Sequence, residues 1–184
     1  MDSPAPVYTK RCTQRLSIWL RFVAMIASLV AVIAFGYAQY RHDNEEVVLS
    51  DLGHHVVTPA TGTTEYAFIW SLMVVAIELS TPVPIHPGIY VAFDLIAFLA
   101  VTVGVAIYLA IMSPYYSGDG YRCGRLFADC DGKQLANVEH FATAMAFLGA
   151  VIHLGFFVMA CRATDKLRKS QRVVKKQGLG NTSA

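Results

Sequence analysis

The sequence predicts an all-α membrane protein, a four-transmembrane-helix bundle with both termini cytoplasmic. Of its 184 residues, 55% are hydrophobic and only 15% are charged, whereas an average soluble domain has about 25% charged residues. The hydrophobic residues are gathered into long runs, and a helix of about 20 apolar residues can cross a bilayer. The net charge of +2 is too small to suggest a nucleic-acid partner.

The four predicted spans cover about residues 16–38, 66–82, 89–112 and 138–161. The first is too long for the roughly 7–15-residue apolar region of a signal peptide, so we expect it to be retained. The second is the shortest, because Pro82 and the prolines after it end a helix. The third and fourth are each long enough to cross the hydrocarbon core.

The positions of Lys and Arg predict the orientation. Basic residues occur in the segment 1–15 and in the tail 162–184, whereas the segment between the first two spans carries Arg41 against five acidic residues. By the positive-inside rule, both termini face the cytoplasm and this acidic segment faces out. The tail cations that we expect to lie against anionic lipids are Lys166, Arg168, Lys169, Arg172, Lys175 and Lys176.

The four cysteines fit this topology. Cys123 and Cys130 lie close together in the predicted third loop, on the oxidising side, where we expect a disulfide. The alternatives are two free thiols or half of a metal site, although further zinc ligands are missing nearby. Cys12 and Cys161 lie at the cytoplasmic ends of the first and fourth spans, where they are either palmitoylation sites or unmodified.

Four ionisable residues lie in the cytoplasmic halves of the predicted spans: Arg21, Glu78, Asp94 and His153. Glu139 and His140 lie at the outer mouth of the fourth span. Charged groups in the hydrocarbon core are costly and rarely face lipid unpaired. We therefore expect Arg21 to hold Asp94 with two parallel hydrogen bonds, with Glu78 or His153 completing the network. One alternative is that Arg21 snorkels to the headgroups; another is that the cluster serves a proton or ion pathway.

Small residues recur four apart in the first span and again in the fourth, among them Ala24 with Ser28 and Ala146 with Ala150. Such spacing lets helices approach closely in lipid. It serves either packing within the bundle or a homo-oligomer interface, and the first use is the commoner one.

Four spans, an Arg in the first and an Asp in the third resemble the MARVEL family of tetraspan membrane proteins, in particular those of filamentous fungi. The stretches "YAFIWSLMVVAIEL", with Trp70, and "HLGFFVMACRATDKLRK" add to this resemblance, which covers about residues 12–168. The plant Casparian-strip membrane proteins are related and share the Arg-plus-Asp pattern, here Arg21 and Asp94. The resemblance implies membrane apposition, lateral organisation of membrane domains and vesicle traffic, without chemistry.

The sequence contains no Gly-rich phosphate loop and no nucleophile or zinc motif, so we expect no enzymatic activity, no cofactor and no metal. The predicted function is organisation of membrane domains; the alternative is a small ion or proton conduit or transporter accessory subunit that uses Asp94, Glu78 and His153. The expected partners are membrane lipids, other membrane proteins and further copies of the chain. The expected location is the plasma membrane or a secretory-pathway or vesicle membrane.

Overall fold

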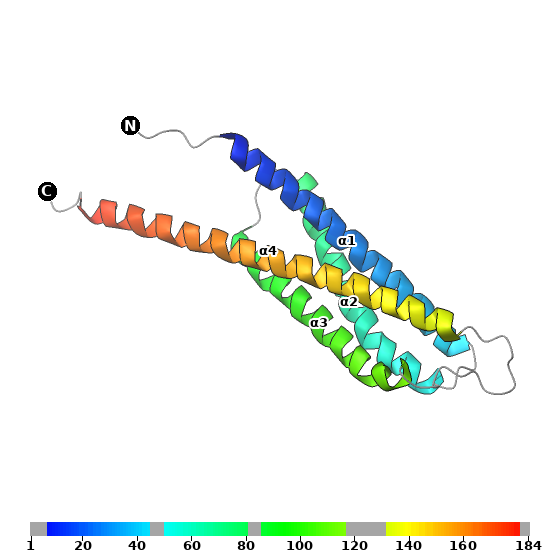
Figure 1. Cartoon of the computed structure of the whole chain (residues 1–184). Coiled ribbons are helices and arrows are strands. Elements are labelled where there is room, and N and C mark those ends of the chain that lie inside the picture. Colours follow the sequence, from blue (N-terminus) through cyan, green and yellow to red (C-terminus); the bar gives the residue numbers. More distant parts are fainter. Residues whose placement is uncertain (1–6, 45–49, 81–85, 117–131, 181–184) are drawn as a thin grey trace, which may run out of the picture.

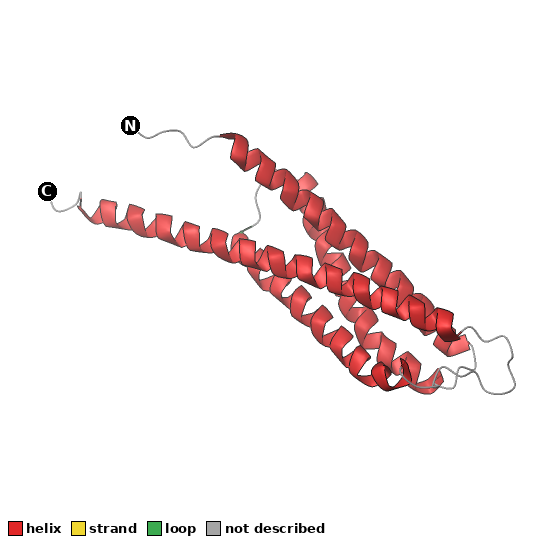
Figure 2. Cartoon of the chain, in the orientation of Figure 1, coloured by secondary structure: helices red, strands yellow, loops and turns green. Residues whose placement is uncertain are grey.

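The computed structural model describes residues 7–44, 50–80, 86–116 and 132–180. Apart from His86, all of these residues are helical (Figure 2). The helices are α1 (Val7–Asn44), α2 (Ser50–Ser80), α3 (Pro87–Tyr116) and α4 (Gly132–Gly180). Each is long and apolar enough to cross a membrane, over Leu16–His42, Val57–Ser80, Pro87–Met112 and Gln134–Lys166. The prediction of an all-helical chain with four candidate spans is therefore confirmed.

The helices run alternately up and down (Figure 1), and the order in which they pack places them at the corners of a square. Each packs against its two neighbours in the order α1, α2, α3, α4 and back to α1. Consequently α1 lies diagonally opposite α3, and α2 lies diagonally opposite α4. The start of α1, the end of α2, the start of α3 and the tail of α4 share one end of the bundle, which we call the termini end.

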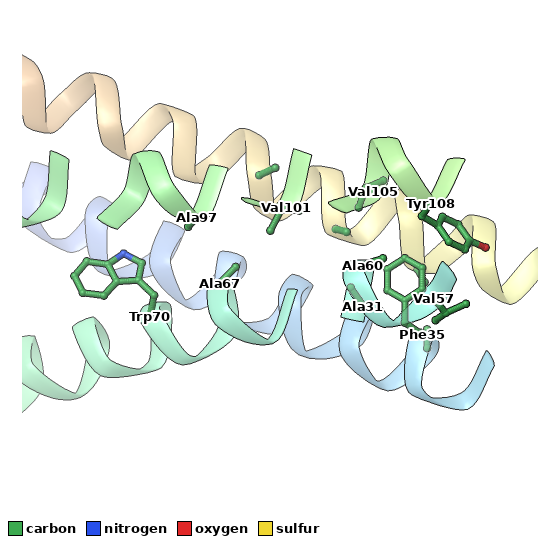
Figure 3. Close-up of a cluster of buried hydrophobic side chains, with 14 of the residues drawn as sticks. Ala31, Phe35, Val57, Ala60, Ala67, Trp70, Ala97, Val101, Val105 and Tyr108 are labelled. Atoms are coloured by element: carbon green, nitrogen blue, oxygen red, sulfur yellow. The ribbon is translucent and has the colours of Figure 1, made fainter. Parts of the chain in front are cut away.

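Small side chains line the axis of the bundle and large ones point outward. The fully or nearly fully buried residues include alanines from every helix, such as Ala31, Ala67, Ala97 and Ala146, which allow the helices to approach closely. Near the end opposite the termini, the core fills with aromatic rings: Phe35 meets Tyr108 edge to face at 5.5 Å (Figure 3). The outward-facing residues are mostly large and apolar, as a lipid-facing surface requires.

The second candidate span covers Val57–Ser80, whereas our prediction covers residues 66–82. The part that the prediction leaves out, residues 57–65, is rich in threonine. Thr61, Thr63 and Thr64 each donate a hydrogen bond from the hydroxyl to a carbonyl of their own helix one turn earlier. A hydroxyl bonded in this way needs no water, so the segment can be buried despite its composition.

His86 caps the start of α3. Its carbonyl accepts a hydrogen bond from Ile89 N–H, and its Nδ1 accepts one from Gly88 N–H. Pro87 occupies the first helical position, where a missing N–H costs nothing.

The tail of the chain continues α4 as a helix to Gly180. The basic, polar composition of the tail predicts disorder beyond an initial helical extension; the helix over residues 162–180 shows that this prediction is wrong.

Candidate functional site: a buried cluster around Asp94

Asp94 lies fully buried near the axis of the bundle, toward the termini end. Arg21 of α1 reaches it across the diagonal of the square and donates two hydrogen bonds, of 3.0 Å to Oδ1 and 2.7 Å to Oδ2. The Arg21 side chain is only 3% exposed, so the alternative in which it snorkels to the headgroups does not hold. The planar guanidinium fits the carboxylate edge to edge, which a lysine ammonium could not do.

The other two helices also donate to Asp94. Trp70 of α2 donates from Nε1 to Oδ1 over 2.8 Å, and His153 of α4 lies with Nδ1 3.1 Å from the same oxygen. A carboxylate only accepts, so His153 donates from Nδ1. One carboxylate thus holds side chains from the three other helices. We call Arg21, Trp70, Ser71, Asp94 and His153 the Asp94 cluster.

His153 also joins Ser71 to the Asp94 cluster. With Nδ1 donating to Asp94, the other ring nitrogen of His153, Nε2, faces Ser71, whose Oγ lies 3.4 Å from it. The serine hydroxyl can donate to this nitrogen. The imidazole therefore links Ser71 of α2 to Asp94 of α3 through two hydrogen bonds.

Aromatic rings enclose the Arg21 guanidinium. Its Cζ lies 4.1 Å from the centroid of the Phe156 ring and 5.0 Å from that of Tyr90, distances at which a cation and a π-face attract. Of the two residues that we expect to complete the network, His153 does so, whereas Glu78 accepts a hydrogen bond of 2.8 Å from the hydroxyl of Tyr90. Glu78 is therefore linked to the cluster through Tyr90, whose hydroxyl bonds Glu78 and whose ring contacts the guanidinium of Arg21.

Ser71, His153 and Asp94 are connected in the order found in serine hydrolases, hydroxyl to imidazole to carboxylate. No sequence motif indicates this arrangement, because the three residues come from three different spans. All three side chains are fully buried, and a hydrolase needs its serine open to substrate. Asp94 is also neutralised by Arg21. The geometry therefore fits a hydrogen-bond chain that locks helices better than it fits a nucleophile.

A second buried polar pair lies at the end opposite the termini, and we did not predict it. His42 Nε2 of α1 and Glu139 Oε1 of α4 are 2.8 Å apart, and both side chains are fully buried. His42 ends the first candidate span and Glu139 lies near the start of the fourth. Because neighbouring antiparallel helices bring those ends together, the spacing could have indicated the contact. Polar contacts therefore join α1 to α4 near both ends. His42 and Glu139 contact each other directly, whereas Arg21 and His153 are joined through their common partner Asp94.

Between the two polar sites, the bundle axis is largely apolar. Ser28 and Thr143 are buried there, but Thr102 bonds its own helix at the Phe98 carbonyl, and Ala31, Val101 and Ala146 fill the centre. Glu139 lies fourteen residues from His153 along α4, about 21 Å at 1.5 Å per residue. This distance is far too long for direct proton transfer between the sites.

The remaining predicted sites are distributed as follows. Cys161 is a free, partly exposed thiol on α4; Cys12 lies on α1, and its side chain is outside the described part. Cys123 and Cys130 lie outside the described residues, so their disulfide stays a prediction. In the described ranges, no group of three or more His, Cys, Asp or Glu side chains could hold a metal ion.

Comparisons of the chain with protein-family models, with curated proteins and with solved structures found no match. The MARVEL resemblance therefore stays a prediction carried by topology and by Arg21 and Asp94.

Proposed function

We propose that the chain is a non-enzymatic, multi-pass membrane protein of MARVEL-like type that organises membrane domains, with both termini in the cytoplasm. It acts as a fixed four-helix body whose apolar surface contacts lipids and other membrane proteins. Its location would be the plasma membrane or a secretory-pathway or vesicle membrane.

The observation that carries the proposal is the saturation of Asp94 by side chains of all three other helices. An ionisable group kept for transport must exchange partners or protons with an aqueous path. Asp94 is instead held by a bidentate Arg21, an indole N–H and an imidazole N–H. This arrangement favours a constant spacing and rotation of the helices, and hence a constant outer surface for lipids and partners.

Photobleaching of the tagged protein in its native cell, beside a plasma-membrane marker, tests this function. An organiser of membrane domains recovers slowly and in discrete patches, whereas the marker recovers quickly. Fast and uniform recovery over the same membrane would contradict the proposal.

A conduit is the second candidate, and the Asp94–His153–Ser71 hydrogen-bond chain is the observation in its favour. A purified-protein liposome flux assay separates the two functions. We expect no sustained proton or ion flux above that of empty liposomes. Sustained flux that is abolished by Asp94→Asn would replace the organiser with a conduit.

A further inference from the structure

The last part of α4 extends beyond the bundle without a break. The candidate span ends at Lys166, while the helix ends at Gly180. At 1.5 Å per residue, about 20 Å of helix continues past the span. In Figure 1 this part, coloured orange to red, stands clear of the other three helices. We call residues 167–180 of α4 the rod.

The rod and the turn before it are strongly basic. Residues 162–180 contain seven Lys and Arg but a single acid, Asp165. That acid is bonded one turn along to Lys169, at 2.8 Å, and this hydrogen bond raises the pKa of Lys169. Those cations whose side chains are described all point into solvent: Arg162, Lys166, Arg168, Lys169 and Arg172. The described exposed side chains of this stretch include five cations and one acid, so positive charge dominates the part of its surface that the structure describes.

The direction of the rod decides which surface its charges can meet. A helix that continues straight from a span points away from its own bilayer, even at the usual tilt of about 20°. Lys175 lies nine residues beyond Lys166, or about 13 Å along the axis. The Debye length at physiological ionic strength is only about 8 Å. The outer cations of the rod therefore interact weakly with the membrane that holds the bundle.

We propose that the rod binds the anionic surface of a second, apposed membrane. This inference rests on the proposed function and names the partner that it would bring together. An anionic bilayer is a broad, planar field of negative charge that requires no fixed register, and it suits exposed cations spread along and around a helix. Each Lys or Arg that comes near such a surface strengthens binding about fivefold.

A vesicle-capture assay tests the proposal with the full chain. The protein is reconstituted in phosphatidylcholine vesicles, and protease accessibility measures the fraction of tails that face out. Labelled, protein-free acceptor vesicles of phosphatidylcholine, with or without phosphatidylserine, are then added, and their co-flotation is measured. We expect capture of the phosphatidylserine vesicles alone, and a steep loss of capture as salt is raised.

Two variants separate the charge of the rod from its direction. The triple variant Arg168→Gln/Lys169→Gln/Arg172→Gln should weaken capture by roughly a hundredfold, while Gln171→Ala, on the same exposed stretch, should capture normally. Ser170→Pro keeps every charge but interrupts the helix, so that the distal cations can fold back onto their own membrane. It should also lose capture, because the rod no longer points outward.

Three outcomes would overturn the proposal. Undiminished capture by the triple variant would show that the cations of the rod do not bind the acceptor vesicles. Undiminished capture by Ser170→Pro would show that binding does not require the rod to point away from its own membrane. Absence of capture by the parent chain, with outward-facing tails verified, assigns the basic surface to another partner such as an acidic protein. Slow photobleaching recovery retained by the triple variant would show that the organiser function stands when tethering fails.

Discussion

Arg21 and Asp94 lie on helices at opposite corners of the bundle, yet their side chains meet in a doubly bonded pair at 3.0 and 2.7 Å. Each is essentially inaccessible to solvent. Breaking a buried pair leaves one uncompensated charge, which typically costs about 3–5 kcal/mol. We expect Arg21→Ala to lower the free energy of unfolding in detergent by this amount, as measured by denaturant titration.

Two further variants test the origin of that loss. Arg21→Lys keeps the positive charge but lacks the planar guanidinium that makes two parallel hydrogen bonds. It should therefore be more stable than Arg21→Ala but less stable than the parent chain. The double variant Arg21→Met/Asp94→Leu removes both charges and should be far more stable than Arg21→Ala. If Arg21→Ala unfolds at the same denaturant concentration as the parent, the pair is not structural.

Trp70→Phe tests the indole donor. The substitution keeps a ring that can stack on Phe93, which lies 4.6 Å away at 18°, but it removes the N–H that reaches Asp94 together with part of the buried ring volume. A hydrogen bond to a charged group contributes about 1.5–3 kcal/mol and the cavity adds to this cost, so the variant should lose at least that amount of stability. Trp19→Phe is the matched control, because Trp19 is 71% exposed and its loss should change little. Equal effects of the two substitutions would contradict the assigned hydrogen bond.

Gly104→Ala tests the close approach of α2 and α3. An added Cβ would lie 2.5 Å from Thr63 Oγ1 and 3.0 Å from the backbone oxygen of Pro59. Since backbone cannot give way, we expect a loss of about 1–3 kcal/mol from overpacking. Gly155→Ala is the control on α4, where nothing lies within 4 Å of the new methyl. It should be neutral or stabilising, since Gly weakens a helix interior by about 0.5–1 kcal/mol relative to Ala.

The His42–Glu139 pair gives a fourth prediction. His42→Ala leaves Glu139 buried beside a cavity and should lower the melting temperature clearly. Glu139→Gln should have a milder effect, because the amide oxygen can still accept from the imidazole at the 2.8 Å site. Gln134→Ala, at an exposed position of the same helix, controls for substitution near the helix start. A melting temperature that is unchanged in His42→Ala would show that the pair does not stabilise the α1–α4 interface.

Sequence reasoning located Arg21, Asp94 and His153 because depth along a span follows from residue number alone. The fourfold coordination of Asp94 did not follow, since rotation of each helix about its axis decides which side chain faces inward. Trp70 was noticed only as part of a family resemblance, although an indole has a donor that must be satisfied when buried. Depth alone makes Glu78 and His153 equal candidates for the remaining place beside Asp94; the structure gives that place to His153, while Glu78 accepts its hydrogen bond from Tyr90.

The start of the second span also depends on which side chains are buried, and the sequence does not reveal this. Hydropathy counts a threonine as polar, whereas Thr64 bonds the Ala60 carbonyl and is 1% exposed. His42 and Glu139 were overlooked because each lies at the end of a span, where a polar residue is ordinarily solvated. Only the pairing of the helix ends reveals that both are buried.

The meeting of four helices at Asp94 also bears on how the protein is made. Arg21 is synthesised 73 residues before Asp94, a delay of roughly 4–15 s at about 5–20 residues per second. During that interval the first span carries a charge that, at a helix centre, disfavours insertion by about 2.5–3.5 kcal/mol. An unfinished or truncated chain keeps this charge exposed to lipid, and a completed one hides it. Until the third span has been synthesised, Arg21 therefore lacks the carboxylate that balances its charge, so a complete set of spans is needed before the first span reaches its final environment.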